Sequence, residues 1–162
     1  MKSKRIAFLG GGNMAEAIIG GLLAGGVSME GNIVAADVAE GRRALLENKY
    51  GIAATGDNAA AVRGADVVVL AVKPQQVPEA LAAARSAFTD KQLLVSICAG
   101  LPTAALEKQV PARTVRAMPN LPALVRRGVT AICAGARRKR IWTWPGSSSR
   151  RWASRCACRR AR

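Results

Sequence analysis

A glycine-rich turn near the amino end of the sequence has the composition of a phosphate-binding site. Residues 10–15 read Gly-Gly-Gly-Asn-Met-Ala and fit the pattern G-x-G-x-x-G/A. Gly10 permits a tight turn, Gly12 lets the backbone approach a pyrophosphate, and Ala15 lets a following helix pack near a strand. Asp37 ends the next apolar run about twenty residues on, where this pattern has an acidic residue. The spacing predicts a dinucleotide whose pyrophosphate meets the amino end of the helix.

Charged residues around Asp37 leave the choice between NAD and NADP open. Asp37 could accept a hydrogen bond from the 2′-hydroxyl of the adenosine ribose, which would favour NAD and repel a 2′-phosphate. Arg42 and Arg43 could instead pair with the 2′-phosphate of NADP. The alternative for both arginines is a solvated helix face. NAD and NADP therefore both remain candidates.

Short apolar runs alternate with amphipathic helical patterns along residues 5–118. We expect strands at residues 5–9, 32–36, 52–54, 66–72, 93–98 and 114–118. We expect helices at residues 13–24, 39–50, 58–63, 77–88 and 103–110, the last begun by a hydroxyl cap and the second with Leu45 and Leu46 inward. Alternation of this kind predicts an α/β protein with right-handed crossovers and a doubly wound parallel sheet, the NAD(P)-binding Rossmann fold.

Small or polar residues follow three of the expected strands. In parallel sheets, the carboxyl ends of the strands border the crevice that holds ligands. Lys73 could sit there beside a phosphate or ribose, and Ala99 with Gly100 offers a surface without large side chains for a nicotinamide. Asn120, near two prolines, could orient a carboxamide or a carboxylate. The alternative for Lys73 is a solvated loop lysine, and the alternative for Asn120 is a plain turn without a ligand.

The composition excludes several classes of catalytic site. The 162 residues leave room for one domain with a hydrophobic core. The sequence has no histidine, which excludes His-based zinc sites and Ser-His-Asp or Cys-His catalysis. Cys98 and Cys133 lie in apolar runs that we expect to be buried strands, and we expect no metal site. No apolar run reaches the roughly 18–20 residues of a membrane span, so we expect a cytoplasmic protein without a membrane partner.

Residues 137–162 differ sharply in composition from the rest of the chain. Residues 1–136 carry 15 Lys and Arg against all 10 Asp and Glu, whereas the last segment holds 10 basic residues, no acid and all three tryptophans. We therefore expect a folded domain at residues 1–136 and an irregular, disordered basic tail at 137–162. Our hypothesis is that the tail is the product of a frameshift. Clustered arginines attract nucleic acid without specificity, so no specific nucleic-acid partner is expected.

Four segments together form a specific combination of motifs. They read FLGGGNMA at residues 8–15, AVKPQ at 71–75, VSICAG at 95–100 and MPNLPAL at 118–124. In order and spacing they resemble the N-terminal half of pyrroline-5-carboxylate reductases, over nearly all of residues 5–135. One departure is Leu121, because the family usually has Asn-Thr-Pro where this chain has Asn-Leu-Pro.

The resemblance implies hydride transfer from C4 of NADH or NADPH to the C=N carbon of 1-pyrroline-5-carboxylate, a small-molecule substrate, to give L-proline. It implies homo-oligomers formed through a helical second half that also supplies substrate-binding residues. Nothing in residues 137–162 resembles that half, so no catalytic residue is assigned, and a cofactor-binding module without catalysis is the alternative. The resemblance places Asn58 at the adenosine side. The expected cofactor-binding residues are Gly10, Gly12, Asn13, Met14, Ala15, Asp37, Asn58, Ala71, Val72, Lys73, Pro74, Cys98, Ala99, Gly100 and Asn120.

Overall fold

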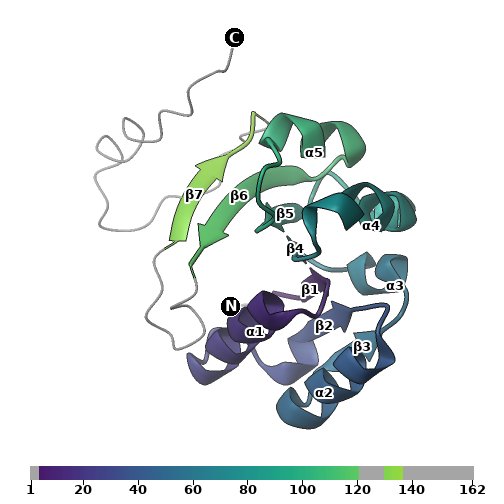
Figure 1. Cartoon of the computed structure of the whole chain (residues 1–162), viewed down its shortest axis with the longest axis vertical. Helices are drawn as coiled ribbons and strands as arrows, with labels where there is room; N and C mark the ends of the chain where they lie inside the picture. Colours follow the sequence, from purple (N-terminus) through teal and green to yellow (C-terminus); the bar gives the residue numbers. More distant parts are fainter. Residues whose placement is uncertain (1–3, 121–129, 137–162) are drawn as a thin grey trace.

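The computed structural model describes residues 4–120 and 130–136, which form one seven-stranded sheet with helices on both faces (Figure 1). The strands are β1 (Ile6–Leu9), β2 (Ile33–Ala36), β3 (Ala53–Thr55), β4 (Val67–Leu70), β5 (Leu93–Ser96), β6 (Arg113–Pro119) and β7 (Thr130–Ala134). Their order is β3-β2-β1-β4-β5-β6-β7. The first six strands pair in parallel, and β7 pairs with β6 antiparallel. This order confirms the doubly wound sheet predicted from the alternating pattern.

Five α-helices and three short 3-10 helices connect the described strands. The α-helices are α1 (Asn13–Ala24), α2 (Glu40–Tyr50), α3 (Asn58–Val62), α4 (Val77–Ala84) and α5 (Thr103–Gln109). The 3-10 helices are η1 (Glu30–Asn32), η2 (Pro74–Gln76) and η3 (Arg85–Ala87). Helices α1 and α2 pack on one face of the sheet, and α3, α4 and α5 pack on the other. None of the helices in the described part of the chain is long and apolar enough to cross a membrane.

The core lies in two layers, one on each face of the sheet. In β4, Val68 and Leu70 face α3, α4 and α5, whereas Val69 faces α1 and α2. Alternate side chains of a strand point to opposite faces, so a central parallel strand needs apolar residues at every position. The run from Val67 to Leu70 meets this requirement, which explains why it reads as a continuous apolar segment.

The structure corrects several local expectations. Strands β4 and β5 end two residues earlier than predicted, because the chain leaves the ladder to form the loops at the sheet edge. Cys133 is only half-buried, because β7 is an edge strand. Leu45 is 37% exposed, whereas Leu46 is fully buried against α1 and the sheet. The predicted tail, residues 137–162, and residues 121–124 of the fourth motif lie outside the described residues.

Helix caps also differ from the prediction. Thr103 is the first helical residue of α5, and Pro102 stands at the N-cap without a side-chain hydrogen bond, so the predicted hydroxyl cap is wrong. Helix α3 has the cap that the sequence analysis did not identify. The Asp57 carboxylate accepts hydrogen bonds from the amides of Ala59 and Ala60, which satisfies the first N–H groups of this short helix.

A buried glutamine joins the start of β5 to the segment between α3 and β4. Gln92 is 4% exposed, and its Nε2 donates to the carbonyls of Val62 at 3.0 Å and Ala65 at 2.9 Å. Its Oε1 accepts from the Thr89 amide at 2.7 Å. One side chain thus satisfies three backbone groups, and it fixes where α3 ends and β4 begins.

Replacing this glutamine by leucine should destabilise the fold. Gln92→Leu keeps most of the volume but removes the side-chain partner of the Ala65 carbonyl and the Thr89 amide, whereas the Val62 carbonyl keeps the Ala65 amide as a partner. The loss should cost about 2–3 kcal/mol of unfolding free energy. Urea unfolding followed by circular dichroism measures the loss. The control is Gln75→Ala, because Gln75 is exposed. Equal stability of the two variants would contradict a structural role for Gln92.

Candidate dinucleotide-binding site

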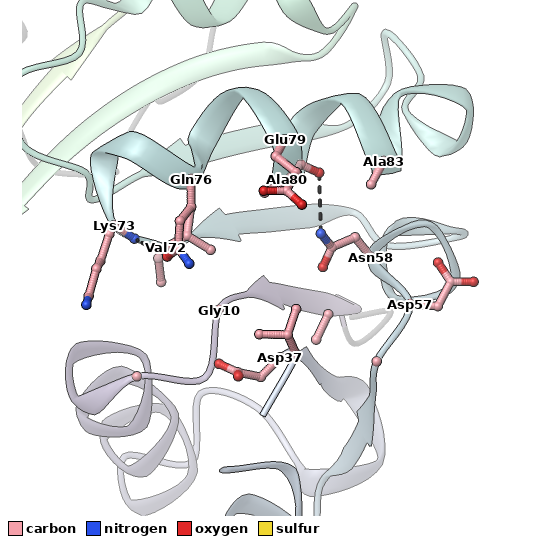
Figure 2. Close-up of a pocket in the computed structure, with 15 residues that line it drawn as sticks. Gly10, Asp37, Asp57, Asn58, Val72, Lys73, Gln76, Glu79, Ala80 and Ala83 are labelled. Atoms are coloured by element: carbon pink, nitrogen blue, oxygen red, sulfur yellow. Dashed lines mark hydrogen bonds between the residues drawn. The ribbon is translucent and has the colours of Figure 1, made fainter. Parts of the chain in front are cut away.

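A pocket of about 560 Å³ opens at the carboxyl ends of β1, β2 and β4 (Figure 2). Several residues that the sequence analysis assigned to a cofactor line it. They are Gly10, Gly12, Asp37, Asn58, Ala71, Val72 and Lys73. Figure 2 shows Lys73 and Gln76 at one end of the pocket and Asn58 at the other, with Asp37 on the opposite wall. Segments far apart in the sequence therefore meet at the edge of the sheet where α/β proteins bind ligands.

The turn after β1 can form only because residue 10 is a glycine. Gly10 has φ +96°, a conformation that L side chains rarely adopt. A Cβ at this position would lie 2.8 Å from the carbonyl oxygen of Ala71. The Gly10 amide donates to the carbonyl of Ala36 at 2.8 Å, which ties the turn to the end of β2.

Asp37 binds the glycine turn through its carboxylate. Its Oδ2 accepts from the Gly11 amide at 2.7 Å, and its Oδ1 accepts from the Ala39 amide at 2.9 Å. Both oxygens therefore have a backbone partner before any ligand arrives. The side chain nevertheless lines the pocket, and a carboxylate oxygen can accept more than one hydrogen bond.

Both arginines at the start of α2 bind backbone carbonyls. Arg42 donates to the Gly11 carbonyl from Nε at 2.8 Å and from Nη2 at 2.5 Å. Arg43 donates from Nη1 to the carbonyls of Asp37 at 2.9 Å and Val38 at 3.0 Å. The alternative of a solvated helix face is therefore wrong for both side chains. Since Val38 lines the pocket, Arg43 lies at its rim.

Glu16 of α1 is the centre of a charged cluster with α2. Its carboxylate accepts from Arg42 and from Lys49, each at 2.8 Å, and from the Tyr50 hydroxyl at 3.3 Å. The hydrogen bonds from Lys49 and Arg42 hold the pKa of Glu16 below its usual value. The cluster joins the first turn of α1 to α2, next to the glycine turn.

The segment after β4 supplies the wall opposite the turn. Ala71 and Val72 line the pocket, and Lys73 lies at its mouth with its backbone amide bonded to the side chain of Gln76 at 3.3 Å. At the far end, Nδ2 of Asn58 donates to the Ala80 carbonyl at 3.5 Å, the dashed line in Figure 2. The end of the pocket at Lys73 is thus bonded to η2, and the end at Asn58 is bonded to α4.

The remaining predicted residues do not line this pocket. Asn13, Met14 and Ala15 form the first turn of α1, and Pro74 begins η2. Ala99, Gly100 and Asn120 follow β5 and β6 at the same edge of the sheet, beside the pocket. Their contact with a cofactor stays a prediction.

Cys98 is buried below this edge rather than directed into the pocket. It is 3% exposed, and its Sγ lies 3.1 Å from the Val72 carbonyl and 3.5 Å from that of Leu70. Burial raises the pKa of its thiol. The predicted buried thiol is confirmed, and any contact with a cofactor would have to come from the backbone of Cys98.

The sequence analysis missed part of the pocket lining. Val38 and Gly56 follow β2 and β3, and Glu79, Ala80 and Ala83 lie on α4. The helical spacing of Ala80 and Ala83 is a signal that could have been found, because small residues three apart leave room beside a helix. That α4 packs beside α3 and shares the pocket lining with the residues after β2 and β3 comes only from the fold.

The ion pairs of Glu16 should make stability depend on pH in the acid range. A carboxylate whose pKa is lowered by folding contributes stability above its unfolded pKa, near 4.5, and loses it as the pH falls through the folded pKa. Lys49 is 57% exposed, so this contribution should be about 1 kcal/mol at most.

Urea unfolding of wild type and Glu16→Gln at several pH values between about 3 and 7 checks this expectation. The wild-type curve should fall more steeply towards acid pH than the curve of Glu16→Gln. Glu47→Gln removes an exposed acid from α2 and is the control. Parallel curves for all three proteins would show that the Glu16 pairs contribute nothing.

The chain is similar to an oxidoreductase family and to several pyrroline-5-carboxylate reductases. Residues 5–100 match the family described as "NADP oxidoreductase coenzyme F420-dependent". A pyrroline-5-carboxylate reductase of Pseudomonas aeruginosa is 46% identical over 138 residues, which cover 84% of this chain and 50% of that protein.

Two solved structures of such reductases share the fold. The protein from Coxiella burnetii is 35% identical with a TM-score of 0.81, covering 86% of this chain and 52% of its own. The protein from Plasmodium falciparum, with NADP bound, is 25% identical with a TM-score of 0.74, covering 86% of this chain and 51% of its own.

The resemblance found in the four motifs is thereby confirmed, and the chain spans about half the length of the curated relatives it matches. Because the family match covers more than half of its residues, the chain belongs to the family of NADP oxidoreductases described as coenzyme F420-dependent.

Proposed function

We propose that this chain binds NADPH or NADH in the pocket and acts in the reduction of 1-pyrroline-5-carboxylate to L-proline. The observation that carries the proposal is the pocket itself, where the glycine turn, Asp37 and the segment after β4 come together. The reductases named above, at up to 46% identity, support the substrate. We also propose that the dinucleotide-binding unit ends near residue 136, since the described strands end at Ala134.

The geometry suggests how the residues would hold the cofactor. Helix α1 begins without a side-chain cap, so its first amides and its positive end are available to a pyrophosphate. The adenosine would extend towards Asn58, where Ala80 and Ala83 leave space along α4. The nicotinamide would extend past Lys73 towards the ends of β5 and β6.

When bound, the cofactor supplies the hydride for the C=N carbon. The protein's part is position and electrostatics. Lys73 at the mouth of the pocket would place a positive charge beside the phosphate or ribose. The loops after β5 and β6 would form the floor beneath the nicotinamide. Strand β5 lies next to β4, β6 lies next to β5, and all three run in parallel, so both loops would lie at the edge of the sheet that carries the crevice.

Arg43 is the residue that we expect to favour NADPH. It lies at the rim beside Val38, and its guanidinium also approaches Gly56 on the pocket wall. The Asp37 carboxylate would oppose a 2′-phosphate, but its two oxygens already accept from backbone amides. The guanidinium of Arg43 can pair with the 2′-phosphate without breaking these hydrogen bonds of Asp37.

A second candidate function is cofactor binding without catalysis. The observation that favours it is the length of the match, because the chain spans about half of the relatives it resembles. The two functions share the pocket and differ only in turnover.

Titration of the 162-residue chain with NADPH and NADH, followed by fluorescence, tests the shared step. We expect saturable binding of NADPH, and oxidation of NADPH on addition of 1-pyrroline-5-carboxylate if the chain is a reductase. Binding without oxidation would favour the second function. If the chain bound neither NADPH nor NADH, both candidate functions would be rejected.

A substitution of Arg43 tests the nucleotide preference. Arg43→Met should weaken NADPH binding by about tenfold and leave NADH binding within about twofold, because only NADPH carries the 2′-phosphate. Arg85→Met, an exposed residue of η3 that does not line the pocket, is the control for a lost positive charge. Equal weakening of NADPH and NADH by Arg43→Met would show that Arg43 does not read the 2′-phosphate.

A further inference from the structure

The peptide group of Gly11 is held from both sides by charged side chains. Its N–H donates to Oδ2 of Asp37 at 2.7 Å. Its carbonyl accepts two hydrogen bonds from Arg42, at 2.8 Å from Nε and 2.5 Å from Nη2. Gly11 is the middle glycine of the turn, a position to which the dinucleotide pattern assigns no residue type.

Fixing the Gly11 carbonyl also fixes the amide of the next residue. In a trans peptide the C=O of one residue and the N–H of the following residue point in opposite directions. The Gly11 carbonyl points at the Arg42 guanidinium, so the Gly12 N–H points away from Arg42. Gly12 lines the pocket, and no hydrogen bond among the described residues uses its amide. This amide is therefore held ready for a ligand.

Glu16 holds Arg42 in turn and closes a ring of contacts. Oε2 of Glu16 accepts from Nη2 of Arg42 at 2.8 Å, and the Glu16 amide donates to the Gly12 carbonyl at 2.9 Å. The side chains of Arg42 and Glu16 are 26% and 18% exposed. Such partial burial makes the pair stronger than a solvated one. The ring runs from the turn to α2, from α2 to α1, and back to the turn.

We propose that Arg42, held by Glu16, is a positioning residue that orients the Gly11–Gly12 peptide towards the cofactor pyrophosphate, and that it is not itself a phosphate ligand. The proposal rests on the proposed function, since it assumes that a dinucleotide occupies the pocket. It separates two neighbouring arginines that the sequence treats alike. Arg43 would read the 2′-phosphate, whereas Arg42 would act on the pyrophosphate through the backbone.

Nucleotides that differ in their phosphates test this division in the full chain. NADH and NADPH both carry the pyrophosphate, whereas adenosine 2′-monophosphate carries only the 2′-phosphate. Arg42→Met should weaken NADH and NADPH alike, by about tenfold, and leave adenosine 2′-monophosphate within about twofold. Arg42→Lys should rescue little, because one ammonium cannot reproduce the forked contact with Gly11 and Glu16.

Two results with Arg42→Met would overturn the proposal. Weaker binding of NADPH and adenosine 2′-monophosphate with unchanged NADH would make Arg42 a ligand of the 2′-phosphate. Unchanged binding of all three would leave it without a role at the site. The salt dependence of NADH binding gives a further readout, because removing a phosphate ligand should flatten it and removing a positioning residue should not.

Glu16→Gln tests whether Arg42 is a positioning residue or a phosphate ligand, because the two roles predict opposite changes in the affinity for NADH. If Arg42 positions the turn, weakening its anchor should weaken NADH binding severalfold. If Arg42 contacts phosphate, removal of the competing carboxylate should tighten NADH binding. Glu47→Gln, which removes an exposed acid from α2, the helix of Arg42, should change nothing in either case. Each variant is titrated at a temperature below the midpoint of its own thermal unfolding, so that unfolding is not mistaken for a loss of affinity.

The outcomes also separate this inference from the proposed function. A wild-type chain that binds neither NADH nor NADPH overturns the proposed function, and the inference falls with it. A wild-type chain that binds both, together with an Arg42→Met variant that binds them equally well, overturns the inference alone.

Discussion

The close passage of the glycine turn beside the end of β4 is the constraint on which the pocket depends. Strands β1 and β4 pair up to Leu9 and Leu70, and the Ala71 amide then donates to the Leu9 carbonyl at 2.8 Å. At the next step the backbone of Gly10 lies so near Ala71 that a Cβ would not fit. The glycine turn and the segment after β4 can therefore form two walls of one crevice. Helix α1 begins immediately after the turn, at the same edge of the sheet.

The charged side chains around this crevice form hydrogen bonds that hold the glycine turn in place without any ligand. Asp37, which follows β2, and Arg42 of α2 both bind the peptide groups of Gly11 in the turn, and Glu16 of α1 accepts a hydrogen bond from Arg42. A site that is already bonded in this way has little to reorganise when an anion arrives. Lys73 differs from them, because it is exposed at the mouth and its side chain has no anionic partner in the described part of the chain.

The sequence was sufficient for features that depend on local pattern. The valine run of β4, the glycines at 10 and 12 and Asp37 each have a type and spacing that point to one structure. The doubly wound sheet followed from the alternation of strands and helices. Features that depend on distant pairs were not predictable. Arg42 is 31 residues from Gly11, and Gln92 is 30 residues from Val62, so only the fold shows that they meet. The half-buried Cys133 was mispredicted because an edge strand and a central strand have the same apolar composition.

The position of Cys98 has a consequence for the chemistry of its thiol. Sγ is enclosed between the ends of β4 and β5 and lies within hydrogen-bonding distance of the carbonyls of Leu70 and Val72. A thiol with a raised pKa stays protonated at neutral pH and reacts slowly with alkylating agents. Its modification therefore requires the contact between Cys98 and the Leu70–Val72 backbone to open, so the rate at which Cys98 is alkylated measures how often the structure opens locally beside this wall of the crevice.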